Sequence, residues 1–307
     1  MARAHQPDVL VLGGGGVLGE AWMTAVLAGL ADGGSFDARE CEGYVGTSAG
    51  SIVAAGLVAG IDPASRVEEF PEQPAPVDPT TGRGRGAATR AVGLSLAAGG
   101  AIAAPLAAIG LRTTEAGGAL LRRAALARMP VGRRSLAGLG RQLEEAGATW
   151  DGRLGIAAVD LGSGRRVIFG SPGAPEISVG RAVEASCAIP GVFSPVRLQG
   201  RRYVDGGVWS PTNLDRAIVH RGTEVLCLNP TGSMRPARAA PLGALGPVSR
   251  SIAALEALAL QRRGASVTVV SPDAAASKAI GTNLMDPSRR SGVSAAGLAQ
   301  GRALARP

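Results

Sequence analysis

The residue whose surroundings point most clearly to covalent chemistry is a serine flanked by glycines. Ser48 stands in Gly46-Thr-Ser48-Ala-Gly50, a G-x-S-x-G pattern between an apolar run that ends near residue 46 and a helix-forming stretch over 52–59. A sharp strand-to-helix turn needs small neighbours around its serine, and it lifts the hydroxyl out at the carboxyl end of a sheet. The pattern favours a nucleophile; a serine that only caps the helix is the alternative.

A nucleophilic serine needs a base that takes its proton. The chain has two histidines, His5 and His220. His5 precedes the first expected strand, and His220 ends an expected helix over 214–220, where a surface position is the ordinary outcome. The chain order Ser48, Asp205, His220 nevertheless matches an α/β-hydrolase triad, so a Ser-Asp-His esterase stays open.

A carboxylate is the other available base. Asp205 ends a short expected strand and is followed by Gly206 and Gly207, which leave room for a serine loop to approach. A free aspartate has a pKa of about 3.9 and is a weak base, but burial beside Ser48 would raise that pKa and fix the hydrogen bond. The alternative is a turn aspartate that only accepts from its own backbone.

A glycine-rich turn precedes both residues. Gly14, Gly16 and Gly19 form G-x-G-x-x-G after the apolar run 8–12. A dinucleotide-binding loop would also need a second strand that ends in an acidic residue about 20 positions later. The acidic residues there lie in the polar stretch 35–42, so a nucleotide-binding module is the weaker alternative. The backbone N–H groups of such a loop can converge on an anion in any case.

The elements around these residues predict an α/β fold. Strand, glycine turn and helix follow one another twice within the first 60 residues, which is typical of a parallel sheet. A hairpin is expected over 154–161 and 166–170. Further strands are expected at 201–204, 224–228 and 266–270, and further helices at 118–128, 135–146, 249–262 and 290–304.

Composition excludes several classes of protein. The chain has 307 residues, 46% hydrophobic and 18% charged, which indicates a globular protein. The net charge is +8, but aromatic residues are 3% and the arginines are scattered, so no nucleic-acid partner is expected and anionic lipid headgroups fit better. Three distant cysteines indicate neither disulfides nor a metal site. With no signal-peptide pattern at the start, a cytoplasmic location is expected.

Residues 71–135 differ from the rest of the chain. They are rich in Gly, Ala and Pro, and residues 91–111 carry no charge. A helix of that length could cross a bilayer, although four glycines and Pro105 interrupt it. Buried core, a mobile or interfacial cap and a membrane span all stay open, and buried core is favoured.

In combination these motifs resemble the patatin-like phospholipase family. The glycine turn, Gly46-Thr-Ser48-Ala-Gly50-Ser and Asp205-Gly-Gly carry the resemblance, together with EASCAIPGVFSPV at 184–196 and AAVDLGSGR at 157–165. The resemblance covers roughly residues 8–60 and 150–300.

The resemblance implies a three-layer α/β/α sandwich with a mostly parallel central sheet, as one domain over 1–307 with 71–135 as an insert or cap. Ser48 would be the nucleophile and Asp205 its base, in a dyad without histidine. The backbone at Gly14, Gly15 and Gly16 would stabilise the oxyanion. The substrate would be a phospholipid or another acyl ester, with peripheral membrane contact left open, no cofactor or metal, and an undetermined oligomeric state.

Two segments depart from the family pattern. The glycine loop of the family usually starts with Asp and carries Arg or Lys before its last glycine, where this chain has Gly13 and Leu18. The Asn-Pro that usually follows Asp-Gly-Gly is replaced by Pro211-Thr-Asn213. The absent cation bears on headgroup contact or loop anchoring and leaves the dyad intact.

Overall fold

A computed structural model describes residues 6–68, 115–234 and 245–306, and in these ranges one eight-stranded sheet organises the chain. The strand order is β5-β6-β3-β2-β1-β7-β8, with β4 paired to β3. The strands β3, β2, β1, β7 and β8 are parallel, whereas β4 and β6 both pair antiparallel with β3, and β5 pairs antiparallel with β6. Their bounds are β1 Val9–Leu12, β2 Gly43–Thr47, β3 Leu154–Asp160, β4 Arg166–Phe169, β5 Val196–Leu198, β6 Arg201–Asp205, β7 Glu224–Leu228 and β8 Ser266–Val270.

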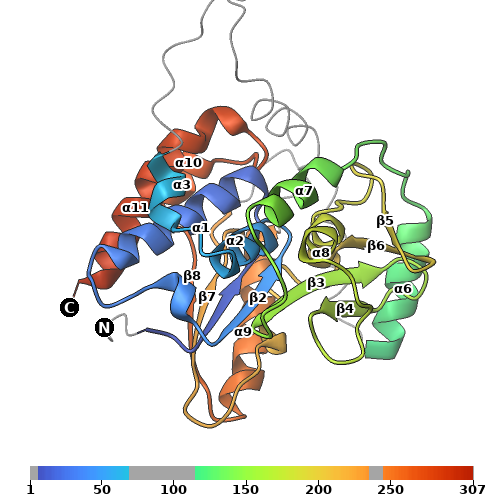
Figure 1. The fold of residues 1–307 in the computed structure, drawn as a ribbon, viewed down its shortest axis with the longest axis horizontal. Coiled ribbons are helices and arrows are strands. Elements are labelled where there is room, and N and C mark those ends of the chain that lie inside the picture. Colours follow the sequence, from blue (N-terminus) through green and yellow to red (C-terminus); the bar gives the residue numbers. More distant parts are fainter. Residues whose placement is uncertain (1–5, 69–114, 235–244, 307) are drawn as a thin grey trace, which may run out of the picture.

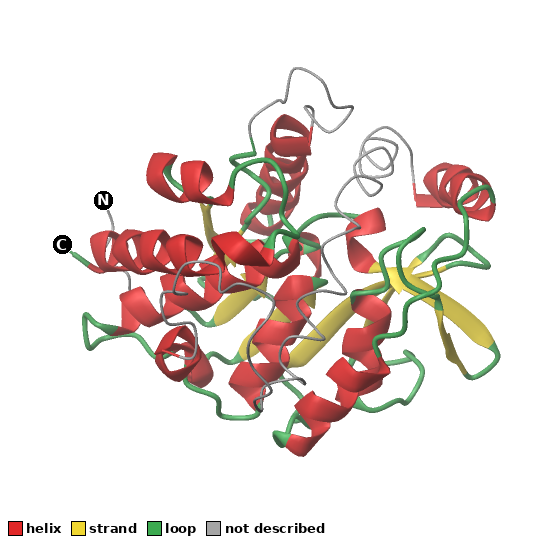
Figure 2. Ribbon diagram, turned by 90° about the horizontal axis from the view of Figure 1, so that it is seen from above, coloured by secondary structure: helices red, strands yellow, loops and turns green. Residues whose placement is uncertain are grey.

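Helices cover both faces of this sheet (Figures 1 and 2). One face carries α1 Gly16–Ala31, α2 Ala49–Val58 and α8 Val179–Ser186, with α3 Pro63–Glu68, α7 Ala137–Glu145, α10 Ala274–Ile280 and α11 Arg290–Ala305 packed outside them. The other face carries α6 Glu115–Ala127, α9 Leu245–Gln261 and the 3-10 turn η3 Leu214–Arg216. Further 3-10 turns in the described ranges are η1 Ala38–Glu40, η2 Gly206–Val208 and η5 Pro287–Arg289.

Alternation along β1 shows why both faces are covered. Leu10 and Leu12 belong to the core under α1 and α2, whereas Val9 and Val11 belong to the core under α9. Successive strand residues point to opposite faces, so an entirely apolar strand needs a helical layer on each side. The α/β/α sandwich expected from the sequence is therefore confirmed.

Strand β3 brings two distant segments together. Ala157 pairs with Thr47 of β2 on one edge and with β4 on the other, and Ala158 pairs with Asp205 of β6 and again with β4. Since β4 occupies one edge, β2 and β6 share the opposite edge and meet end to end. The residue after Thr47 and the last residue of β6 are thereby placed side by side.

Most expected elements are present, but the helix expected over 214–220 is wrong. Only η3 forms, and Ala217 already has extended backbone with φ −57° and ψ 130°. Ala217 and Val219 are buried under α9, whereas Ile218 between them is 73% exposed. Burial of every second residue is the period of an extended strand and not of a helix. An extended segment is therefore what packs between α9 and the sheet.

Part of the region 71–135 lies outside the described residues, including the charge-free stretch 91–111. Buried core, cap and membrane span therefore stay predictions for that stretch. The described part contains α6, and Leu126 of that helix packs on Val159 and Val204 of the sheet. Among the helices in the described ranges, none is long and apolar enough to cross a membrane.

Candidate active site

Ser48 occupies a strained turn between β2 and α2. Its backbone has φ 50° and ψ −122°, a conformation that costs a side-chain-bearing residue about 1–3 kcal/mol. The turn is also too tight for side chains beside it: a Cβ at Gly46 would lie 2.5 Å from Ser51 Cα, and one at Gly50 would lie 1.9 Å from the Leu12 carbonyl oxygen. The pentapeptide is therefore dictated by sterics.

The hydrogen bonds of this turn fix its backbone and leave the Ser48 side chain out of helix capping. Ser48 N–H donates to Ser186 Oγ at 2.9 Å, and that hydroxyl donates to the Ala157 carbonyl at 2.6 Å. The Ser51 hydroxyl donates to the Ser48 carbonyl at 2.6 Å. Ser48 Oγ accepts no cap hydrogen bond from the described start of α2. The capping interpretation is thus wrong.

Asp205 lies close enough to Ser48 for the serine hydroxyl to act on the pKa of its carboxyl. The residue is 6% exposed, and burial raises the pKa of its carboxyl to about 6, against the lowering effects of the Ser48 hydroxyl and of the Gly207 N–H at 2.7 Å. A Cβ at Gly206 would lie 2.4 Å from the Ala157 carbonyl oxygen, so only glycine lets the chain turn here against β3. The carboxylate caps its own turn and also faces Ser48.

The glycine loop borders Ser48, but one of its three expected oxyanion donors is occupied. A Cβ at Gly14 would lie 3.4 Å from Ser48 Cβ. The Gly14 N–H, however, donates to the Pro211 carbonyl at 2.8 Å and is not free. For the N–H groups of Gly15 and Gly16 at the start of α1, no partner exists among the described residues. Gly19, one turn further, packs on Pro230.

The two alternative sites fail on position. His220 is exposed and precedes β7, which runs parallel with β1 and β2, so it lies at the amino edge of the sheet. Ser48 follows the carboxyl end of β2, about 15 Å away at 3.3 Å per strand residue. A Ser48-Asp205-His220 triad is therefore ruled out. The dinucleotide interpretation fails too, because β2 ends in Thr47, where an acidic residue is needed.

Cys187 lies in the same buried region. Its Sγ is 3.8 Å from Ser51 Oγ, and burial followed by the charge of Asp205 raises the pKa of the thiol. The thiolate is the reactive form, so this environment makes the thiol inert, as the sequence suggested. Cys41 and Cys227 are free and buried as well.

Sequence reasoning missed three contributors to the site. Ser186 lies inside the 184–196 motif but its link between Ser48 and β3 depends on tertiary contact. The loop Ser210–Asn213, which contains the altered Pro-Thr-Asn order, closes on the glycine loop and on Thr47. Glu256 on α9 accepts hydrogen bonds from Thr212 of that loop and from Leu214, the residue after it. Only the loop left a sequence signal, in that altered order.

The protein is an α/β/α sandwich with a serine turn at the carboxyl edge of its parallel strands. A buried aspartate faces that serine. This arrangement is typical of hydrolases. The pattern that defines the patatin-like phospholipase family matches residues 10–218, more than half of the chain. The chain belongs to the patatin-like phospholipase family. It is accordingly a hydrolase that acts on ester bonds, with lipid acyl groups as its substrate class.

Two solved structures show a distant likeness. VipD from Legionella pneumophila has a TM-score of 0.46 and 16% identity, and the match covers 98% of this chain and 67% of VipD. The type III effector protein ExoU has a TM-score of 0.32 and 17% identity, with 96% of this chain and 53% of ExoU covered. The family membership rests on the family match.

Proposed function

We propose that this protein hydrolyses carboxylic esters of lipids through a Ser48–Asp205 dyad and an acyl-enzyme. The observation that carries the proposal is the position of Ser48, which lies in a strained elbow close to a buried carboxyl group whose pKa is raised to about 6. A base with that pKa is mostly ionised at neutral pH and accepts a proton more readily than a free aspartate does.

In the first half-reaction Asp205 takes the Ser48 hydroxyl proton as Oγ attacks the ester carbonyl carbon. The negative charge that develops on the carbonyl oxygen is stabilised by the N–H groups of Gly15 and Gly16, which have no partner among the described residues and lie at the positive end of α1. When the C–O bond breaks, the proton on Asp205 passes to the leaving alcohol oxygen.

In the second half-reaction water releases the acyl group. Asp205 takes a proton from water, the hydroxide oxygen attacks the acyl carbon, and the proton returns to Ser48 Oγ as the carboxylic acid leaves. An alcohol in place of water would give a new ester, so transacylation uses the same residues. Added glycerol that shifts product from acid to ester would reveal that activity.

The test is a comparison of Ser48→Ala, Asp205→Asn and His220→Ala with wild type on p-nitrophenyl butyrate. We expect the first two to lose about 10³-fold or more in kcat/KM, since each removes a group that acts as part of a unit. His220→Ala serves as the control and should keep wild-type activity. A fluorophosphonate probe should phosphonylate Ser48 of wild type with loss of fluoride, and mass spectrometry should find no adduct in Ser48→Ala.

Loss of activity in His220→Ala, or an adduct on another residue, would contradict the dyad. Retained activity in Asp205→Asn would remove Asp205 from the mechanism.

We also propose that residues 1–307 form one domain and that it contacts membranes peripherally. A single sheet takes strands from Val9 to Val270, and residues 128–134 give it an exposed basic rim near the site. In this 128–134 loop, Val131 is 67% exposed between Arg128 and Arg133, which are exposed too. The loop rests on the segment after Cys187, since Ser194 Oγ donates to the Gly132 carbonyl at 2.7 Å.

A further inference from the structure

The loop Ser210–Asn213 contacts all three parts of the proposed active site. The Pro211 carbonyl accepts the Gly14 N–H at 2.8 Å, which ties it to the glycine loop. The Thr212 carbonyl accepts the Thr47 hydroxyl at 3.2 Å, next to the nucleophile. Asn213 Nδ2 donates to the Gly206 carbonyl at 3.4 Å, next to Asp205. One four-residue segment thus holds the three segments that must meet for catalysis.

Asn213 is the centre of these contacts. Its Nδ2 also donates to Thr47 Oγ1 at 3.0 Å and to the Ser210 carbonyl at 2.8 Å. Its backbone is left-handed, with φ 50° and ψ 32°, which asparagine tolerates better than most residues do. The residue is fully buried, so a lost amide would leave buried partners unsatisfied.

The orientation of the Asn213 amide is set by Arg166. Arg166 Nη1 donates to Asn213 Oδ1 at 3.0 Å, and its two terminal nitrogens also pair with the Asp215 carboxylate at 2.7 and 2.6 Å. Arginine has donors only, so the amide oxygen must face it and the amide nitrogen must face Thr47 and Gly206.

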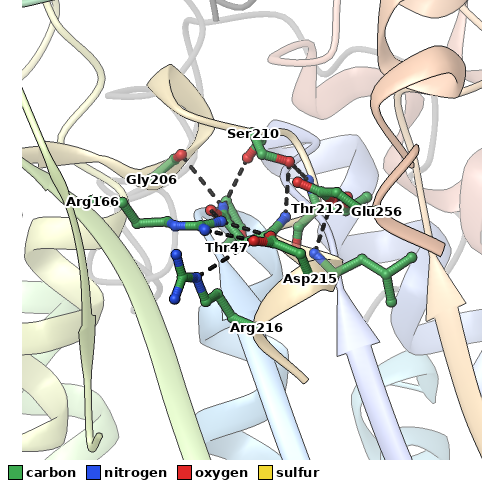
Figure 3. A network of polar contacts seen from close by, with 10 residues as sticks. Thr47, Arg166, Gly206, Ser210, Thr212, Asp215, Arg216 and Glu256 are labelled. Atoms are coloured by element: carbon green, nitrogen blue, oxygen red, sulfur yellow. Dashed lines mark hydrogen bonds and ion pairs between the residues drawn. The ribbon is translucent and has the colours of Figure 1, made fainter. Parts of the chain in front are cut away.

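Glu256 supports the loop from α9, on the sheet face opposite to α1 and α2. Its Oε2 accepts the Thr212 hydroxyl at 2.6 Å and the Leu214 N–H at 2.9 Å (Figure 3). Burial, followed by the nearby charge of Asp215, raises the pKa of this carboxyl to about 7. Glu256 lies beyond the matched residues 10–218, so the family pattern does not include it.

We propose that Asn213 and Glu256 are positioning residues, which hold the Ser210–Asn213 loop so that Ser48, Asp205 and the glycine loop keep their mutual geometry. This inference rests on the proposed function. Misplacement of a reacting group by about 1 Å can lower the rate about 10²-fold. Loss of a loop that contacts all three segments can therefore lower the rate by that much.

The experiment measures the second-order rate at which a fluorophosphonate probe labels Ser48, alongside kcat and KM on p-nitrophenyl butyrate and the melting temperature. Asn213→Gly keeps the left-handed backbone accessible and removes the amide. We expect labelling and kcat to fall about 10- to 100-fold while KM stays within about twofold, with every molecule labelled in the end. A purely structural role would instead give a reduced labelled fraction that reacts at the wild-type rate.

Paired variants test the contact of the Thr47 hydroxyl and the contact of the Glu256 carboxylate with the loop. Thr47→Ser should restore most of the rate that Thr47→Val loses, because it keeps the hydroxyl. Glu256→Gln keeps an acceptor for Thr212 and should stay within a few-fold of wild type, whereas Glu256→Leu should slow labelling as Asn213→Gly does. Leu255→Gln is the control on α9, since Leu255 is 60% exposed and points away from the network.

Wild-type labelling rates in Asn213→Gly and Thr47→Val would overturn the positioning role while leaving the dyad intact. If Glu256→Leu does not fold, the Thr47 pair and Asn213→Gly still decide the matter. Failure of the probe to label Ser48 in wild type would overturn the proposed function and this inference with it.

Discussion

In the proposed dyad, Asp205 takes the place that a histidine has in many serine hydrolases, and its burial suits it to that role. The pKa of about 6 arises because desolvation outweighs the two hydrogen bonds that favour the carboxylate. About nine tenths of the molecules carry the ionised base at pH 7. A fully exposed aspartate would be ionised as well, but it would hold a proton too weakly to take one from serine.

The pH profile of the reaction should therefore report on Asp205. Its proton blocks the base, so kcat/KM on a soluble ester should be constant above pH 7 and fall about tenfold per unit below pH 6. A stopped-flow series from pH 4.5 to 8.5 measures this. A midpoint near 4, the value of an unburied aspartate, would contradict the burial argument, and a midpoint unchanged in Asp205→Asn would assign the titration to another group.

The same pKa shift predicts the sign of a stability effect. The folded-state pKa lies above the usual 3.8, so the fold favours the protonated form; this contribution is complete below pH 3.8 and is lost as pH rises through about 6. Asp205→Asn should then be more stable than wild type at pH 7.5, by at most about 3 kcal/mol, with a smaller difference at pH 4. Urea unfolding at both pH values tests it, and an equal difference at both would refute this linkage.

Single residues can be predicted from the sequence where their immediate neighbours show what the backbone requires. Ser48 and Asp205 stand out because small residues must flank them, and that crowding is visible in a pentapeptide and in Asp-Gly-Gly. The occupation of the Gly14 N–H could not be foreseen, because its partner Pro211 is almost 200 positions away. The roles of Ser186 and Asn213 depend in the same way on which strands meet along β3.

Among the elements, α11 packs closely on α1, the helix that follows the glycine loop. The two helices run side by side (Figure 1), and glycines at their crossing bring the backbones together. A Cβ at Gly301 would lie 2.3 Å from the Val26 carbonyl oxygen and 2.9 Å from Gly29 Cα. These are backbone atoms, which cannot move aside as a flexible side chain can. Trp22 Nε1 donates to Gln300 at 2.9 Å across the same contact.

Gly301→Ala should therefore destabilise the fold by about 1–3 kcal/mol, since a methyl group has no space at the crossing. Gly292→Ala is the matched control in the same helix. A Cβ there meets nothing within 4 Å, so the better helix propensity of alanine should leave stability unchanged or raise it by up to about 1 kcal/mol. Urea unfolding of both variants gives the comparison. Equal stabilities would mean that α11 does not pack closely on α1.

Element types followed from sequence where periodicity decided them, as in the hairpin β3–β4 and in α9. Two features did not follow. The end-to-end meeting of β2 and β6 is a matter of strand pairing, which no local pattern encodes. Residues 214–220 have a helix-like composition, but Asp215 is held by Arg166 and the chain then buries every second residue. Tertiary contacts override propensity in such short segments.

For the molecule as a whole, a net charge of +8 favours anionic surfaces over neutral ones. The 128–134 loop combines that charge with an apolar tip at Val131. Because Asp205 N–H donates to the Ala188 carbonyl and the Ser194 N–H to the Arg134 carbonyl, this loop and the dyad flank the same segment. A membrane that binds the loop would lie near the site where the acyl ester must enter.

We expect the protein to bind phosphatidylcholine vesicles that contain phosphatidylglycerol more tightly than vesicles of phosphatidylcholine alone, and to lose that preference in about 0.5 M NaCl. Arg128→Gln with Arg133→Gln should weaken the anionic binding about 30-fold, from about 1 kcal/mol per arginine near the surface. Val131→Asp should also weaken the binding to anionic vesicles. Ile218→Asp is the matched control, since Ile218 is 73% exposed and lies beyond the η3 turn, and it should not weaken the binding. Sedimentation with vesicles measures the binding, and p-nitrophenyl butyrate hydrolysis should stay unchanged in all three variants. Equal loss in Val131→Asp and Ile218→Asp would show that total charge, and not the 128–134 loop, governs the contact.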